Sequence, residues 1–286
     1  MKGFFIEKCI EFCICILVII AISYVPFVFW GRVSLSFTTF LQRLFTEGPA
    51  IHNNPMDIPQ LPFWDVIWEP YMYSGIILLA STVLTVVVAT GLSFGYVLSS
   101  LKVKKAIERC LVLIESIPDL LLIFMLQLFF VWLYKQTGVN FVNIYAFGSK
   151  QAYFLPIVTM SLVPALHFFR IMVLFLVEEQ HKPYVEFARA KGLSRKYILF
   201  VHLFRNVIYH LFNHLQSTFL FMVSSLLLVE AAFNINGYMS FILKPLALQP
   251  VTFAWWIFLL FIPFYTMFTL AQFQIKRTTG GLANEK

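Results

Sequence analysis

The sequence predicts an all-α, polytopic membrane protein with six transmembrane helices, and three observations support this fold class. The chain has 286 residues, of which 60% are hydrophobic and only 12% charged, and its mean hydropathy is +0.81. A soluble domain carries about 25% charged residues. Apolar stretches recur that reach the roughly 20 residues needed to cross the hydrocarbon core of a bilayer. Lysine and arginine are distributed unevenly among the loops, which is typical of membrane proteins.

Six apolar stretches are long enough to span a membrane. We expect them at about 9–30, 74–100, 111–134, 152–177, 207–233 and 253–275. The first runs from Cys9 to Trp30, too long for a signal-peptide core and without a small-residue cleavage site, so we interpret it as a retained anchor. Three of the four cysteines lie in or beside it with no partner in an outward loop, and a disulfide framework is therefore not expected.

The positive charges predict the orientation of the chain. The N-terminus, the loops at 101–110 and 178–206 and the C-terminal tail together carry 15 of the 21 lysines and arginines, whereas the opposite side carries five. The remaining one, Arg170, lies inside a segment. Because positive charge accumulates in cytoplasmic loops, we expect both termini and the 178–206 loop to be cytoplasmic. The net charge of +7 therefore does not indicate nucleic-acid binding.

The outward stretch at 31–73 is rich in proline. Its prolines are Pro49, Pro55, Pro59, Pro62 and Pro70. This density favours an extended or turn-rich cap over a compact domain. We expect Trp64 and Trp68 to lie at the membrane interface; docking of a binding protein is the alternative.

The stretch at 183–206 is charged and helix-forming, with hydrophobic segments on both sides. Pro183 suits a first helical position, and Gly192 suits a turn with positive φ at a helix end. Ser194 is expected to cap a second helix that leads into the next membrane segment. Between them, aromatic and small groups recur at helical spacing on one face: Tyr184, Phe187, Ala188 and Lys191. A plain solvated loop would need none of these features.

These residues resemble the cytoplasmic coupling motif in permease subunits of type I ABC importers, with Glu186, Ala188 and Gly192 on its glutamate, alanine and glycine. A longer run is similar to the dipeptide, oligopeptide and nickel permeases: Tyr184, Ala188-Arg189-Ala190-Lys191-Gly192-Leu193-Ser194, His202 and Arg205-Asn206. The resemblance implies that ATPase coupling involves Tyr184, Glu186, Phe187, Ala188, Arg189, Ala190, Lys191 and Gly192.

Three further patterns resemble the same family. They are Thr82-x-Leu84 with Gly91-x-x-x-Gly95, then Ser116-Ile117-Pro118, and finally Glu230, Phe233, Asn234 and Gly237. The last set resembles a Glu-x-x-Phe-x-x-Pro-Gly signature, with Asn236 in place of the proline, and the resemblance places it at an outer gate. Asp119 departs from the family pattern. The glycine pair also favours close helix approach in lipid.

Charged residues inside the apolar segments are candidates for a translocation path. Glu115 and Asp119 are four residues apart, which predicts one face of the third segment; Arg170 lies in the fourth and Glu230 in the fifth. A charge at the bilayer centre costs about 2.5–3.5 kcal/mol, so it normally faces water or a partner charge. A static pair between Arg170 and Asp119 is an alternative to substrate contact. The candidate path or gate residues are Glu115, Asp119, Arg170, Glu230, Phe233, Asn234 and Gly237.

The resemblance implies three regions: 1–73, an extra N-terminal transmembrane helix with the proline-rich segment; 74–275, the importer core with a coupling helix at about 183–191; and 276–286, a cytoplasmic tail. It also implies a bacterial plasma membrane location, a second permease subunit in a heterodimer, two cytoplasmic ATPase subunits and an extracytoplasmic binding protein. No G-x-x-x-x-G-K-[ST] occurs, so the chain is not expected to bind ATP by a P-loop. ATP and Mg are expected on the partner subunits, with no catalytic residue, metal or cofactor in this chain.

Four alternatives remain open from the sequence. In the first, the substrate is nickel or a metal chelate instead of a di- or oligopeptide. In the second, the protein is an ion-gradient carrier whose buried charges form an ion relay. The third is an intramembrane metalloprotease using His210 and His214, but no glutamate follows His210 as H-E-x-x-H requires. Helix packing or a position at the membrane interface is the favoured role for these histidines. The fourth is a non-transporting sensor with the same fold.

Overall fold

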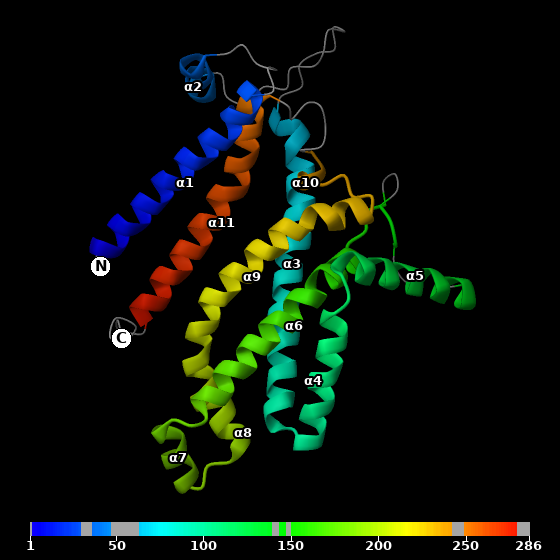
Figure 1. The fold of residues 1–286 in the computed structure, drawn as a ribbon, viewed down its shortest axis with the longest axis vertical. Helices are drawn as coiled ribbons and strands as arrows, with labels where there is room; N and C mark the ends of the chain where they lie inside the picture. Colours follow the sequence, from blue (N-terminus) through cyan, green and yellow to red (C-terminus); the bar gives the residue numbers. More distant parts are fainter. Residues whose placement is uncertain are drawn as a thin grey trace. The chain divides into compact units, whose positions relative to one another are not determined.

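A computed structural model describes residues 2–29, 36–46, 63–138, 143–146, 150–241 and 249–278, and this part of the chain is helical (Figure 1). Its elements are α1 (Lys2–Phe29), α2 (Phe37–Thr46), α3 (Phe63–Leu98), α4 (Leu101–Glu115), α5 (Asp119–Thr137), α6 (Phe154–Glu179), α7 (Pro183–Ala190), α8 (Arg195–Tyr197), the π-helix η1 (Ile198–Leu203), α9 (Phe204–Ala232), α10 (Tyr238–Phe241) and α11 (Pro250–Thr278). The predicted all-α class is confirmed.

Six of the described helices are long and apolar enough to cross a membrane, which confirms the predicted number. The spans are Phe4–Phe29, Phe63–Leu98, Asp119–Thr137, Phe154–Glu179, His210–Ala232 and Pro250–Ile275. The second begins 11 residues earlier than expected, at Phe63 rather than 74, and thus includes Trp64 and Trp68. Both tryptophans are exposed. Their predicted place at a membrane interface stays a prediction.

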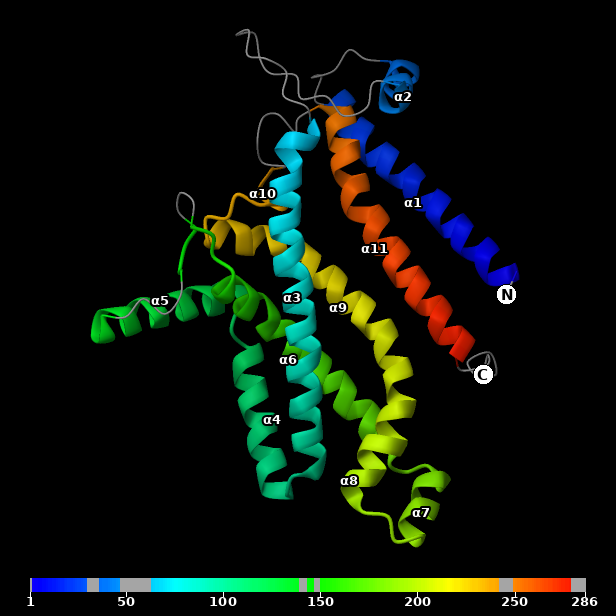
Figure 2. The ribbon, with the colours of Figure 1, turned by 180° about the vertical axis from the view of Figure 1, so that it is seen from behind.

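The chain divides into two compact units, residues 1–69 with 241–286, and residues 70–240. In the second unit, α6 and α9 pack against each other and form its centre (Figures 1 and 2). A row of buried hydroxyl groups joins α3 to α6, because Ser81, Thr85 and Ser93 each donate to an α6 carbonyl, at 3.3–3.4 Å. Bonds of this kind hold helices together where lipid provides no hydrophobic driving force.

In the first unit, α1 and α11 lie side by side (Figure 1), and α2 packs on them. Ser36 caps α2 through its contact with the Thr39 N–H. Phe40 and Leu44, four residues apart on one face, are buried against α1 and α11. The stretch at 31–73 is therefore not simply extended or turn-rich: it includes this amphipathic helix and the start of α3. Four of its five prolines, at 49, 55, 59 and 62, lie outside the described residues.

The third predicted segment is interrupted, and this corrects the expectation of a helix at 111–134. α4 ends at Glu115, Pro118 is extended with ψ of 142°, and α5 begins at Asp119. The residue before a proline is driven out of the α region, so the Ser-Ile-Pro sequence ends one helix before the next begins. Glu115 and Asp119 therefore do not lie on one face of one helix.

The glycine pair of α3 does not mediate a close helix contact in the described part of the chain. Gly91 and Gly95 are exposed, and a Cβ built on either would meet no atom within 4 Å. The hydroxyl row of α3, not the glycine pair, makes the contact with α6.

Candidate functional site

The short helix predicted at about 183–191 forms as α7. Pro183 is its first residue, where its missing N–H costs no hydrogen bond, and Lys182 before it is extended. The helix is eight residues long and runs to Ala190. An isolated helix this short is unstable in water, so packing against α6, η1 and α9 must hold it.

One side of α7 is built into the protein. Val185 and Ala188 are buried, with 0% and 5% of their surface exposed, and Tyr184 is half-buried. Phe187, in contrast, is 62% exposed. The predicted face of Tyr184, Phe187, Ala188 and Lys191 is therefore divided: Ala188 points inward with Val185, whereas Phe187 and Lys191 point outward.

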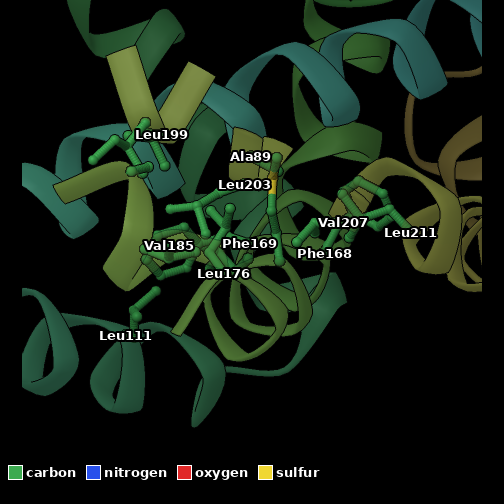
Figure 3. Close-up of a cluster of buried hydrophobic side chains, with 14 residues drawn as sticks. Ala89, Leu111, Phe168, Phe169, Leu176, Val185, Leu199, Leu203, Val207 and Leu211 are labelled. Atoms are coloured by element: carbon green, nitrogen blue, oxygen red, sulfur yellow. The ribbon is translucent and has the colours of Figure 1, made fainter. Parts of the chain in front are cut away.

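The buried side of α7 belongs to a hydrophobic cluster whose members come from six helical elements, α3, α4, α6, α7, η1 and α9 (Figure 3). Val185 lies with Leu176 of α6, with Leu199 and Leu203 of η1, and with Val207 of α9. All five are less than 4% exposed. Burial of a side chain of this kind contributes about 1.5–3 kcal/mol, so the cluster fixes α7 on the α6–α9 pair.

The C-terminus of α7 is closed by a Schellman motif. The Leu193 N–H donates to the Ala188 carbonyl at 3.3 Å, and the Gly192 N–H donates to the Arg189 carbonyl at 2.9 Å. Gly192 has φ of 78°, as predicted, a conformation that residues with a Cβ disfavour. Ser194 then caps α8, because its Oγ accepts from the Tyr197 N–H at 3.3 Å. The chain continues through η1 into α9, and π-helical turns are often found at functional positions.

A polar network joins α7 to both neighbouring helices. The Tyr184 hydroxyl donates to Oε1 of Glu179 at 2.7 Å, and Nδ2 of Asn206 donates to the same oxygen at 3.1 Å and to the Tyr184 hydroxyl at 3.0 Å. Oε2 of Glu179 pairs with Nζ of Lys182 at 2.6 Å. Burial and the hydrogen bond to Glu179 raise the pKa of Tyr184 to about 12, so its hydroxyl remains a donor at neutral pH. We call these four residues the Glu179 network.

No local sequence pattern singles out Glu179. It lies in a run of polar residues, Glu178-Glu179-Gln180, that reads as a solvated helix end. Only the folded chain shows that Glu179 is 6% exposed, while Glu178 is exposed. Its contact with Asn206 spans 27 residues, a separation that local periodicity does not detect.

The outward side of α7 presents a mixed apolar and charged surface. Nζ of Lys191 lies 4.4 Å from the centre of the Phe187 ring, a cation–π geometry. The other exposed predicted coupling residues are Glu186, Arg189, Ala190 and Gly192. Arg195 and Lys196 of α8 are exposed as well. An exposed aromatic ring flanked by cations is suited to contact another protein, since aromatic and arginine side chains are enriched at interfaces.

The predicted gate residues lie together at the other end of α9, in a tightly packed turn. Glu230 is fully buried, and its carboxylate accepts from the Ser74 hydroxyl at 2.6 Å and from the Met239 and Ser240 N–H groups at 3.2 and 2.6 Å. A Cβ at Gly237 would overlap this carboxylate and the Ser74 hydroxyl. The spacing between glutamate and glycine thus has a steric reason: only glycine leaves room for the Glu230 side chain.

The same turn contains a second Schellman motif. Asn234 has φ of 52°, and the Ile235 N–H donates to the Glu230 carbonyl at 2.8 Å. Phe233 is fully buried. Asn236 in place of the expected proline leaves this turn intact. The role of the turn as an outer gate stays a prediction.

The other predicted path residues are on α4, α5 and α6 and are not part of this turn. Asp119 is half-buried at the start of α5, and Arg170 is exposed on α6. Glu115 is the last residue of α4, and its side chain lies outside the described residues. Their contact with a translocated solute stays a prediction.

The two histidines of α9 contact an aromatic ring of α6. His210 stacks on Phe175 with ring centres 5.3 Å apart, and the His214 ring lies 5.5 Å from the same ring. This arrangement supports the packing role favoured for them. Among the described residues, no group of three potential ligands lies close enough to hold a metal ion.

Comparison with known proteins is consistent with this geometry. Residues 87–278, more than half of the chain, match the family described as the binding-protein-dependent transport system inner membrane component. The chain belongs to this family. Its members are membrane components that transport with separate binding proteins, and the matched region includes α7, the Glu179 network and the turn from Glu230 to Gly237.

A segment of this inner membrane component is also similar to one curated protein. It is 42% identical over 62 residues to the inner membrane ABC transporter permease protein YejB of Escherichia coli O157:H7. The aligned segment covers 21% of this chain and 17% of YejB. The chain therefore spans only a small part of the relative that it matches.

Proposed function

We propose that this inner membrane component is the permease subunit of an ATP-driven, binding-protein-dependent importer, and that α7 is its coupling helix. The observation that carries the proposal is the division of α7 into two sides. Val185 and Ala188 are buried in the α6–α9 core, whereas Phe187 and its flanking charges are exposed. A helix built in this way can bind a second protein on one side and move the membrane helices with the other.

The partner on the exposed side is a cytoplasmic ATPase subunit. The positive-inside distribution of lysine and arginine supports a cytoplasmic location for α7. ATP binding closes a pair of such ATPases, and α7 moves with the subunit that holds it. Since a ligand shifts an equilibrium only through different affinities for its two states, the contacts of Phe187 and Arg189 must differ between nucleotide-bound and nucleotide-free forms. A second permease subunit and an extracytoplasmic binding protein complete the complex.

Di- or oligopeptides are the proposed substrate class. The support is the run of residues from Tyr184 to Asn206, which is similar to the dipeptide, oligopeptide and nickel permeases. Nickel or a metal chelate is the alternative within the same family. Uptake of a labelled tripeptide and of nickel ions, compared in cells with and without the intact gene, distinguishes the two.

The ion-gradient carrier is less well supported by the structure. Its proton relay would need Glu230, yet that carboxylate is fully buried and accepts bonds from Ser74 and from two backbone N–H groups of the same turn. A carboxylate held in this way is a structural anchor. ATP-independent uptake driven by a pH gradient would favour the carrier instead.

The decisive test is a photo-cross-link from the exposed side of α7. With p-benzoylphenylalanine at Phe187 of the full-length chain, in membranes that contain its natural partners, we expect an adduct with a protein that carries a P-loop. The same probe at Leu174, which is 65% exposed on α6, serves as the control and should give no such adduct. If Phe187 reacts only with lipid or with no protein, the coupling role is wrong.

A further inference from the structure

The Glu179 network brings three helices to one carboxylate. Glu179 is the last residue of α6, Tyr184 is in the first turn of α7, and Asn206 is near the start of α9. Oε1 of Glu179 accepts from both Tyr184 and Asn206, and these two side chains also bond to each other. The three bonds close a triangle with one corner on each helix.

The triangle differs in kind from the apolar contacts around it. The apolar cluster around Val185 holds α7 against its neighbours but is non-directional, so it specifies the exact position of the helix less sharply than hydrogen bonds do. Hydrogen bonds have preferred distances and angles and weaken steeply outside them. Bonds to an ionised carboxylate are roughly twice as strong as neutral ones. The network therefore fixes the position of α7 along and around its axis.

Opening the network would also be unfavourable. Glu179 is 6% exposed, and an ionised group that loses its partners while buried is strongly destabilising. Oε2 remains paired with the Lys182 ammonium group, which holds the carboxylate in its charged form. A force on α7 will thus move the end of α6 and the start of α9 before it breaks this connection.

Resting on the function proposed above, we propose that Glu179 and Asn206 are positioning residues that make α7, the end of α6 and the start of α9 one rigid body. Through them, displacement of α7 by the ATPase reaches both membrane helices together. Glu179 connects α7 to α6, and Asn206 connects it to α9. A network that only closed the loop between α6 and α7 would need Tyr184 and Glu179 but not Asn206, which is 22 residues beyond Tyr184.

Two distances within this chain test the proposal. Spin labels are attached at Ala190 on α7 and at either Leu174 on α6 or Ile208 on α9, all of which are exposed, in a chain whose four cysteines are replaced by serine. The full complex is measured at rest and after trapping with ADP and orthovanadate. We expect two narrow distance distributions whose means do not change on trapping. A shift of either mean in the otherwise unaltered protein would overturn the proposal.

Substitutions then separate the two connections. In Glu179→Ala both distributions should at least double in width, whereas Glu178→Ala, a neighbouring and exposed glutamate, should leave both unchanged. In Asn206→Leu only the Ala190–Ile208 distribution should broaden, because the bond between Tyr184 and Glu179 remains. Tyr184→Phe keeps the ring and should broaden both, which provides a second variant if Glu179→Ala does not assemble. Unchanged widths in Asn206→Leu and Tyr184→Phe would show that these bonds do not position α7.

The photo-cross-link at Phe187 keeps this result separate from the proposed function. Should the adduct with the ATPase form while the widths in the variants equal those of the parent, the coupling function stands and the positioning role fails. If the distributions broaden in the variants but Phe187 forms no adduct with an ATPase, the network holds α7 rigidly for some other partner. The proposal as stated would then fail together with the proposed function.

Discussion

The Glu230 carboxylate occupies the space in which a Cβ of Gly237 would lie. The two residues are seven positions apart, and the chain between them reverses direction through the Schellman motif at Asn234. The close approach lets the carboxylate bond to the Met239 and Ser240 N–H groups. The backbone N–H groups at the start of α10 can therefore bond to Glu230 only if position 237 has no side chain.

Gly237→Ala is therefore expected to destabilise the protein. Overpacking at a tightly packed site costs about 1–3 kcal/mol, which thermal unfolding of the detergent-solubilised chain would detect as a lower midpoint. Gly91→Ala is the matched control, because a Cβ there meets no atom within 4 Å and alanine is favoured in a helix. Equal midpoints for Gly237→Ala and the parent would contradict this steric account.

Ala188→Asp should leave the chain inserted in the membrane but stop ATP-dependent uptake. Position 188 is 5% exposed in the hydrophobic cluster, and burial of an unpaired carboxylate is strongly unfavourable. We expect α7 to separate from η1, seen as faster amide hydrogen exchange over 183–191. Ala190→Asp changes the charge equally at an exposed position of the same helix and should leave exchange slow. Normal uptake in the Ala188 variant would refute the assignment of α7.

Substitutions of Gly192 should destabilise the turn in proportion to how strongly the new residue disfavours a positive φ. Since φ is 78° here, valine should destabilise the α7–α8 turn by about 1–2 kcal/mol, and asparagine should cost less. Gly192→Pro should be the most damaging, because its φ is fixed near −65°, and we expect it to abolish ATP-dependent uptake without preventing insertion. The measurements are proteolysis at 191–194 and uptake. An order in which asparagine is worse than valine would show that backbone conformation is not the cause.

The Tyr184 hydroxyl should resist ionisation well above neutral pH. Its pKa is raised to about 12 from the usual 10, by burial and by the bond to Glu179. A group whose folded pKa is raised stabilises the fold fully below the unfolded value, so this contribution should persist to about pH 10 and be lost as the pH rises through 12. The difference in near-ultraviolet phenolate absorbance between the parent and Tyr184→Phe measures this titration. A midpoint near 10 would mean that the Glu179 network is not formed.

The helix α2 should depend on its two buried side chains. Phe40 is fully buried, and truncation of such a phenylalanine costs about 3–5 kcal/mol in a protein core. We expect Phe40→Ala to release α2, with faster hydrogen exchange over residues 37–46. Phe45→Ala removes an equal side chain from a position that is 76% exposed and should leave exchange unchanged. Equally slow exchange in both variants would show that Phe40 does not hold α2.

Features with a local cause could be predicted from the sequence. The six spans follow from runs of apolar residues, the positive φ of Gly192 from the need for a residue without Cβ, and the cap at Ser194 from its place before a helix. The prediction failed where helical periodicity was applied without the rule that a proline ends a helix. Periodicity placed Glu115 and Asp119 on one helix face, although Pro118 between them ends that helix.

Contacts between distant residues could not be predicted in this way. Glu178 and Glu179 are chemically identical neighbours, and only the packing of α6 against α7 and α9 buries one and exposes the other. Phe187 and Ala188 share a predicted face, yet the direction of the core divides them. The sequence by itself determined the number of spans and the turn at Gly192 and Ser194, because these depend on composition and on residues within one or two turns. Which side chains meet across helices was decided by the tertiary structure alone, because it depends on how each helix is rotated about its axis when the apolar surfaces pack.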